Sequence, residues 1–124
     1  MNKRLKQKNA LITGGSRGIG RAIGEEFARR GAGIALLART PDDLETAADA
    51  IRSEVPDAEV ITAEADVSDR EMVDETIRTA ISRMGHLDIL VNSAGIASLG
   101  NIDEMPPEEW ERMIQVNLMG VYHC

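Results

Sequence analysis

Short apolar runs alternate along this chain with segments in which apolar residues recur every three or four positions. The runs cover residues 9–13, 34–38, 59–65 and 87–91 and predict β-strands. The amphipathic segment that follows each run predicts a helix. The run 87–91 is too continuously apolar for a sheet that is wet on one face, which is typical of parallel sheets covered on both faces. We therefore predict an α/β fold with a doubly wound parallel sheet, in which residues 1–124 form one domain.

Glycine, proline and capping residues indicate where the helices begin and end. Gly31 and Gly85 are predicted to end the first and third helices, and Pro56 the second. Thr40 is expected to cap the second helix, and Ser68 to begin a capping box for the third. In the first helix the apolar positions at helical spacing are Ile19, Ala22, Ile23 and Phe27. The fourth helix begins at Pro106 and Pro107, and its inward stripe is predicted to be Trp110, Met113, Ile114, Asn117, Leu118 and Val121.

The turn between the first strand and the first helix carries three spaced glycines. Gly14, Gly18 and Gly20 would let the bare main chain approach a pyrophosphate, whose charge the positive end of the helix attracts. A tight turn without a ligand is the alternative. The strand before the turn and the helix after it favour nucleotide binding, whereas the absence of Gly-Lys-Ser/Thr excludes a phosphate loop of the NTPase type.

Charge and composition narrow the choice of partner. The chain has 21 acidic and 14 basic residues, and four of the basic ones, Lys3, Arg4, Lys6 and Lys8, lie in the first eight positions. Because the remainder is strongly acidic, we expect no nucleic-acid binding, and we expect the basic tip to be a frayed, solvated terminus. Cys124 is the single cysteine, so neither a disulfide nor a metal site is predicted. Without a signal peptide or a run of about 20 apolar residues, we expect a soluble cytoplasmic protein with no membrane partner.

Four motifs in order resemble the N-terminal half of the short-chain dehydrogenase/reductase family. They are Thr13-Gly14-Gly15-Ser16-Arg17-Gly18-Ile19-Gly20, Asp66-Val67, Asn92-Ser93-Ala94-Gly95 and Asn117. The resemblance covers essentially the whole chain and is greatest to bacterial-type 3-oxoacyl-carrier-protein reductases and the related small alcohol and sugar dehydrogenases. It implies a Rossmann-type sheet of about four strands in order 3-2-1-4 with four helices. It also implies hydride transfer between a ketone and a secondary alcohol, a small-molecule carbonyl or alcohol substrate, and a homo-oligomeric parent protein. Ser93 departs mildly from the family, which usually has a second asparagine there.

Two arginines favour NADP(H) over NAD(H) as the cofactor. Arg17 lies at the positive end of a helix, where a cation needs a compensating anion, and Arg39 follows the second strand. An NAD enzyme would place an acid at the end of that strand, where this chain has Ala38. In related family members the equivalent arginines clasp the 2′-phosphate; two solvated surface arginines are the alternative.

The resemblance also assigns roles to polar residues. Asp66 would contact the adenine amino group, or it is a turn acid before Ser68. Asn117 interrupts an apolar stripe, so we expect a buried amide that needs a partner. In the family it holds a water of a proton relay, and a backbone hydrogen bond is the alternative. The predicted cofactor-binding residues are Thr13, Gly14, Ser16, Arg17, Gly18, Ile19, Gly20, Arg39, Asp66, Val67, Asn92, Ala94 and Gly95.

The family's catalytic serine, tyrosine and lysine have no counterpart in this sequence. Tyr122 cannot head a Tyr-x-x-x-Lys motif because only two residues follow it, and we interpret Tyr122, His123 and Cys124 as structural and His86 as without a role. We expect an apparently truncated reductase, with the fourth strand at an open sheet edge and the last helix half covered. The alternatives are an inert nucleotide-binding fragment and a module that a partner chain completes.

Overall fold

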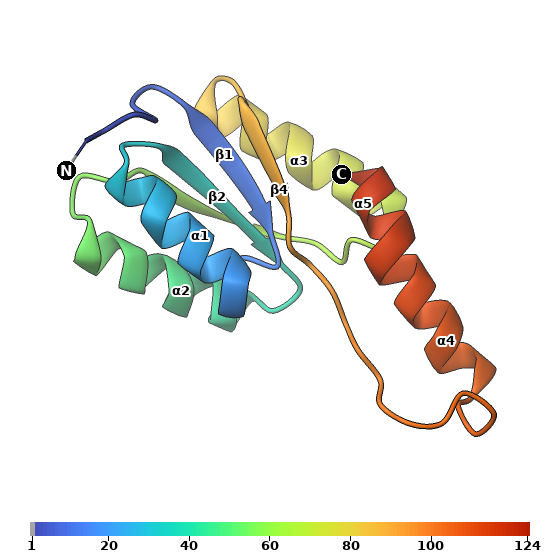
Figure 1. Ribbon diagram of the computed structural model, residues 1–124. Helices are drawn as coiled ribbons and strands as arrows, with labels where there is room; N and C mark the ends of the chain where they lie inside the picture. The colour runs from blue at the N-terminus through green and yellow to red at the C-terminus, as the bar shows by residue number, and fades with distance from the viewer. Residues whose placement is uncertain (1) are drawn as a thin grey trace.

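The computed structural model describes residues 2–124, which build a parallel sheet of four strands in the order β3-β2-β1-β4 (Figure 1). This order and the alternation of strands and helices confirm the predicted doubly wound topology. The fourth strand begins two residues later than its apolar run and extends one residue further. The strands are β1 (Asn9–Thr13), β2 (Gly33–Ala38), β3 (Val60–Glu64) and β4 (Ile89–Asn92).

Four helical segments follow the strands, and the last one changes its winding. Three are regular helices: α1 (Gly18–Arg29), α2 (Pro41–Glu54) and α3 (Arg70–Met84). The fourth consists of α4 (Pro107–Ile114), the π-helical turn η1 (Gln115–Met119) and α5 (Gly120–His123). The residues at both junctions have helical dihedral angles, so the three parts form one continuous rod.

The strand sequences explain why helices cover both faces of the sheet. Along β1, Ala10 and Ile12 contact the core that lies under α1 and α2, whereas Leu11 between them faces the core under α3. Figure 1 shows the same arrangement, with α1 and α2 on one face and α3 on the other. Every residue of β1 is buried, as expected for a strand in the interior of a parallel sheet.

The predicted cap of the third helix is wrong. The third helix is capped by Asp69, whose carboxylate accepts from the Met72 amide, and not by Ser68, because the Ser68 hydroxyl bonds to Asp66 instead. Ile19, in the first turn of α1, is 76% exposed.

The N-terminal segment is also not frayed. The Leu5 amide donates to the Arg30 carbonyl, the Gly33 amide donates to the Lys8 carbonyl, and the Leu5 side chain packs against the core. The segment is thus tied to the end of α1 and to the start of β2.

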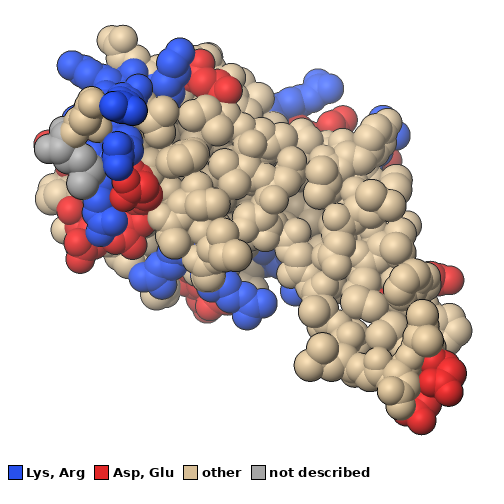
Figure 2. Space-filling model, viewed as in Figure 1, with Lys and Arg blue, Asp and Glu red and all other residues tan. Residues whose placement is uncertain are grey.

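One side of the molecule is left open, as expected. β4 is an edge strand, and Leu90 within it is 38% exposed. Figure 1 shows the connection after β4 running away from the sheet to the far end of α4, and Figure 2 shows a broad surface on this side with few charged groups. Several large apolar side chains are exposed on this connection and the last helix: Leu99, Ile102, Trp110, Leu118 and Tyr122.

Within residues 2–124, every helix is too short or too polar to span a lipid bilayer.

Candidate functional site

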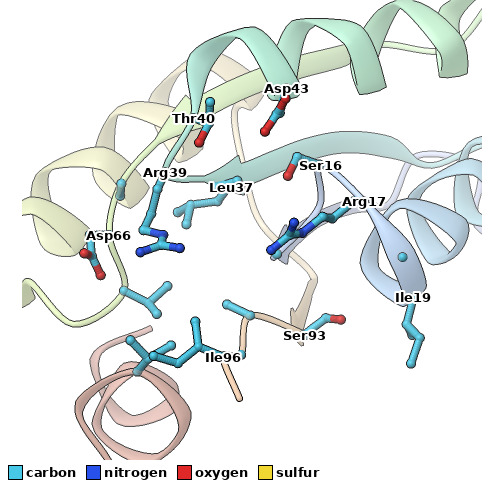
Figure 3. A pocket seen from close by; sticks show the side chains of 18 residues that line it. Ser16, Arg17, Ile19, Leu37, Arg39, Thr40, Asp43, Asp66, Ser93 and Ile96 are labelled. Carbon is cyan, nitrogen blue, oxygen red and sulfur yellow. The ribbon is translucent and has the colours of Figure 1, made fainter. Parts of the chain in front are cut away.

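A cavity of about 430 Å³ lies at the carboxyl ends of the strands, where doubly wound sheets bind ligands (Figure 3). Its walls come from the turn after β1, the end of β2, the segment after β3 and the loop after β4. Its volume is within the range typical of small-molecule sites. The residues that line it are Gly14, Ser16, Arg17, Gly18, Ile19, Leu37, Ala38, Arg39, Thr40, Asp43, Ala65, Asp66, Val67, Ser93, Ala94, Gly95, Ile96 and Val116.

The three glycines of the first turn serve different purposes. A Cβ at Gly20 would collide with the carbonyl of Gly14, and a Cβ at Gly14 would lie 2.8 Å from the main chain of Ala94. These two glycines therefore allow segments of the protein itself to pack closely. Only Gly18 faces open space, with a φ of +58°. Of the three, Gly18 alone has open space where a side chain would stand, and it lines the cavity.

Arg17 and Arg39 project into the cavity from opposite sides, and Figure 3 shows their guanidinium groups directed toward each other. Arg17 is the N-cap of α1, whose first turn carries no acidic residue to balance the positive end of the helix. Across the described residues, neither arginine forms an ion pair. The two cations and the helix end together favour a ligand with negative charge.

Thr13 does not line the cavity, but it holds in place a loop that does. Its buried hydroxyl oxygen accepts from the amides of Ser93 and Ala94 at 3.1 and 3.0 Å. The end of β1 thereby holds the loop that follows β4 against the turn that contains Gly14.

Asp66 follows β3 at the rim of the cavity, and both its carboxylate oxygens accept hydrogen bonds. Oδ1 accepts from the amide and the hydroxyl of Ser68, and Oδ2 accepts from Arg112 at 2.9 Å. Burial by itself would raise the pKa of Asp66, but the Ser68 and Arg112 contacts outweigh burial and lower the pKa to about 2. The side chain is therefore an anion and a hydrogen-bond acceptor at neutral pH.

The lowered pKa of Asp66 predicts an acid-sensitive contribution to stability. An unfolded aspartate titrates near pH 4, so this contribution is complete above about pH 4 and disappears as the pH falls through 2. We expect it to be about 1 kcal/mol, since the carboxylate is partly screened by solvent. Urea unfolding between pH 6 and pH 2 measures it: Asp66→Asn should flatten the decline, whereas the exposed control Asp74→Asn should not. Equal slopes for Asp66→Asn and the parent chain would contradict this assignment.

Asn117 lies in the π-helical turn and is bonded to the loop after β4. Its carbonyl oxygen accepts from the Ile96 amide at 2.9 Å, and its NH₂ donates to the Ile96 carbonyl at 2.8 Å. The residue is exposed, so the predicted buried amide is wrong, and the backbone bonds that were the alternative are present. π-Helical turns often occur at functional sites, and this one directs Asn117 toward a wall of the cavity.

Most of the predicted cofactor-binding residues line the cavity, but Thr13, Gly20 and Asn92 do not. Thr13 and Gly20 support the turn from within, and Asn92 ends β4. Sequence reasoning missed Thr40 and Asp43, which begin α2, and Val116 on the last helix. The rule that ligands bind at strand carboxyl ends could have found the first two, because they directly follow β2.

The remaining candidates lie apart from the cavity. His123 Nδ1 is 2.7 Å from the Val67 carbonyl oxygen, which fits the structural interpretation of this residue. Burial raises the pKa of the Cys124 thiol, so it is less reactive than an exposed cysteine. No cluster of three metal-ligating side chains is present in the described part of the chain.

The sequence of this chain is similar to those of known proteins. The sequence profile described as short chain dehydrogenase matches residues 8–124. Elsinochrome reductase 1 of Elsinoe fawcettii is 39% identical over 120 residues, which are 96% of this chain and 44% of that protein. The 3-oxoacyl-(acyl-carrier-protein) reductase of Staphylococcus aureus is 37% identical over 118 residues, which are 94% of this chain and 47% of that protein. The chain thus spans about half the length of the curated relatives it matches.

A solved structure gives the same result in three dimensions. L-sorbose reductase of Gluconobacter frateurii, crystallised with NADPH and L-sorbose, superposes with a TM-score of 0.90 at 37% identity. The match covers 99% of this chain and 46% of that one.

Proposed function

Because the chain belongs to the short-chain dehydrogenase family, we propose that residues 1–124 form the NADP(H)-binding domain of an oxidoreductase that interconverts a ketone and a secondary alcohol. The observation that carries the proposal is the pair of cavity-lining arginines, Arg17 and Arg39, without acidic partners in the described part of the chain. The reductase crystallised with NADPH supports the choice of cofactor class.

The residues of the cavity fit the parts of such a cofactor. The open main chain at Gly18 and the start of α1 would hold the pyrophosphate, and Arg17 and Arg39 would hold the 2′-phosphate. Asp66 and Val67 would hold the adenine. When bound, the nicotinamide supplies or takes up the hydride.

Asn117 would act at the edge of this site. Its two bonds to Ile96 leave one amide hydrogen and one lone pair free, which suffices to hold a water molecule of a proton relay. The acid–base tyrosine, the lysine and the serine of the family are not matched within residues 1–124, so we propose that they lie outside this segment. The substrate, a small carbonyl compound or alcohol, would meet the cofactor there.

Titration of the chain with NADPH and NADH tests the proposal, with the fluorescence of the reduced nicotinamide as the signal. We expect NADPH to bind at least about tenfold more tightly than NADH, since the 2′-phosphate adds charge-assisted hydrogen bonds. Equal affinities would overturn the preference for NADP(H). Absence of binding to either dinucleotide, in a chain shown to be folded by circular dichroism, would overturn the function.

A turnover assay tests whether the acid–base groups lie outside residues 1–124. With NADPH and a 3-oxoacyl or simple ketone substrate, residues 1–124 alone should bind cofactor without consuming it. Turnover would show that the acid–base groups lie within this segment.

A further inference from the structure

Arg112 connects the last helix to the rim of the cavity without lining that cavity. Its Nη2 donates to Asp66 Oδ2 at 2.9 Å, and its Nη1 donates to Ser68 Oγ at 3.0 Å. Arg112 instead lines a separate shallow hollow, with Ile96, Ala97, Ser98 and Met113 among its neighbours. A ligand in the main cavity would therefore meet Asp66 and not Arg112.

The three side chains form a closed ring of hydrogen bonds. The Ser68 hydroxyl accepts from Arg112 and donates to Asp66 Oδ1 at 2.7 Å, and the Ser68 amide donates to the same oxygen at 3.0 Å. Each partner thus fixes the orientation of the other two. The ring joins residues 46 positions apart in the chain and links α4 to the segment between β3 and α3.

Counting acceptor sites shows what the ring leaves for a ligand. A carboxylate has about four lone-pair sites, two on each oxygen. Asp66 Oδ1 accepts twice and Oδ2 accepts once, so one acceptor site remains, on Oδ2. Because Arg112 holds the carboxylate as an anion, that site can accept a hydrogen bond but cannot donate one.

We propose that Arg112 is a positioning residue for recognition of the adenine base: by holding Asp66 Oδ2, it leaves a single oriented acceptor that an exocyclic amino group can satisfy and a carbonyl group cannot. The inference rests on the proposed function, because it names how the same site distinguishes the base. A purine with a carbonyl at that position brings an acceptor against an acceptor, which costs affinity.

A pair of cofactors that differ at this one position tests the proposal. Isothermal titration compares NADP⁺ with its deaminated analogue, nicotinamide hypoxanthine dinucleotide phosphate, on the same chain. We expect the parent chain to bind NADP⁺ about tenfold more tightly than the analogue. Arg112→Met should weaken NADP⁺ binding and leave the analogue less affected, so that the ratio falls toward one. Arg112→Lys keeps one charge-assisted bond and should restore part of the ratio.

Controls separate positioning from a general loss of structure. Arg78→Met removes an exposed arginine of α3 that has no ion pair in the described chain, and it should keep the parent ratio. If thermal unfolding shows that Arg112→Met does not fold, the affinity ratio is measured on Arg112→Gln instead. This variant keeps polar contact with Ser68 but loses the charge. A ratio that stays at the parent value in the folded Met or Gln variant overturns the proposal.

The result is distinguishable from failure of the proposed function. A parent chain that binds neither cofactor overturns that function and this inference with it. A parent chain that binds both cofactors equally overturns adenine recognition through Asp66, while NADP(H) binding itself remains. A ratio that collapses in Arg112→Met and partly returns in Arg112→Lys supports the positioning role.

Discussion

Replacing Arg39 with aspartate is expected to reverse the preference for NADPH, weakening NADPH binding by about a hundredfold and sparing or improving that of NADH. Arg39 follows β2 and projects into the cavity, so the change removes one cation and puts an anion beside the expected 2′-phosphate. A carboxylate there can instead accept from the 2′-hydroxyl of NADH. Fluorescence titration with both cofactors measures the two affinities.

The matched control for this reversal is Arg78→Asp, which changes the net charge equally at an exposed position of α3 that does not line the cavity. Its two affinities should differ from those of the parent chain by little more than the general charge effect. Should Arg39→Asp keep the parent ratio of NADPH to NADH affinity, the charge argument for the cofactor fails.

Substitution of Gly20 by alanine is expected to cost about 3 kcal/mol in the free energy of unfolding and to abolish measurable cofactor binding. The added Cβ would collide with the Gly14 carbonyl and lie 2.9 Å from the Gly14 carbonyl carbon. Both groups are main chain, so the turn itself would have to move. The measurements are urea unfolding and NADPH titration.

Gly18→Ala in the same turn provides the contrast. Nothing lies within 4 Å of a Cβ at Gly18, so its cost in stability is limited to the strain of a positive φ, about 1 kcal/mol. Its effect on binding should be large, because Gly18 lines the cavity and a methyl group there would occupy space that is now open. If Gly18→Ala destabilises the chain as much as Gly20→Ala, the distinction between the two glycines is wrong.

The sequence predicted what depends on local pattern and on sheet topology. Apolar runs and helix signals placed the strands, and the family resemblance gave their order. The rule on strand carboxyl ends predicted Asp66 at the cavity, and the charge argument predicted Arg17 and Arg39 there. The sequence misplaced the cap of α3 because Ser68 and Asp69 are both good caps, and the contact between Ser68 and Asp66 determines the choice.

The hydrophobic pattern of the sequence could not predict contacts between side chains that are far apart in the chain. Arg112 reads as an ordinary helix-surface cation, and only the packing of α4 beside the segment after β3 brings it to Asp66. In the same way, Asn117 was recognised as unusual, but its partner Ile96 depends on the path of a loop that has no regular structure.

The π-helical turn η1 changes the direction in which the side chains of the last helix point. Such a turn holds one residue more than an α-helical turn, so everything after Met119 is rotated by about 100° relative to an uninterrupted helix. With this offset Gly120 packs closely against Val67, since a Cβ added at Gly120 would lie 2.6 Å from Val67 Cγ2. His123 reaches the Val67 carbonyl, and Asn117 is bonded to Ile96. A single helical rod thereby contacts, with two differently oriented faces, the segments that follow β3 and β4.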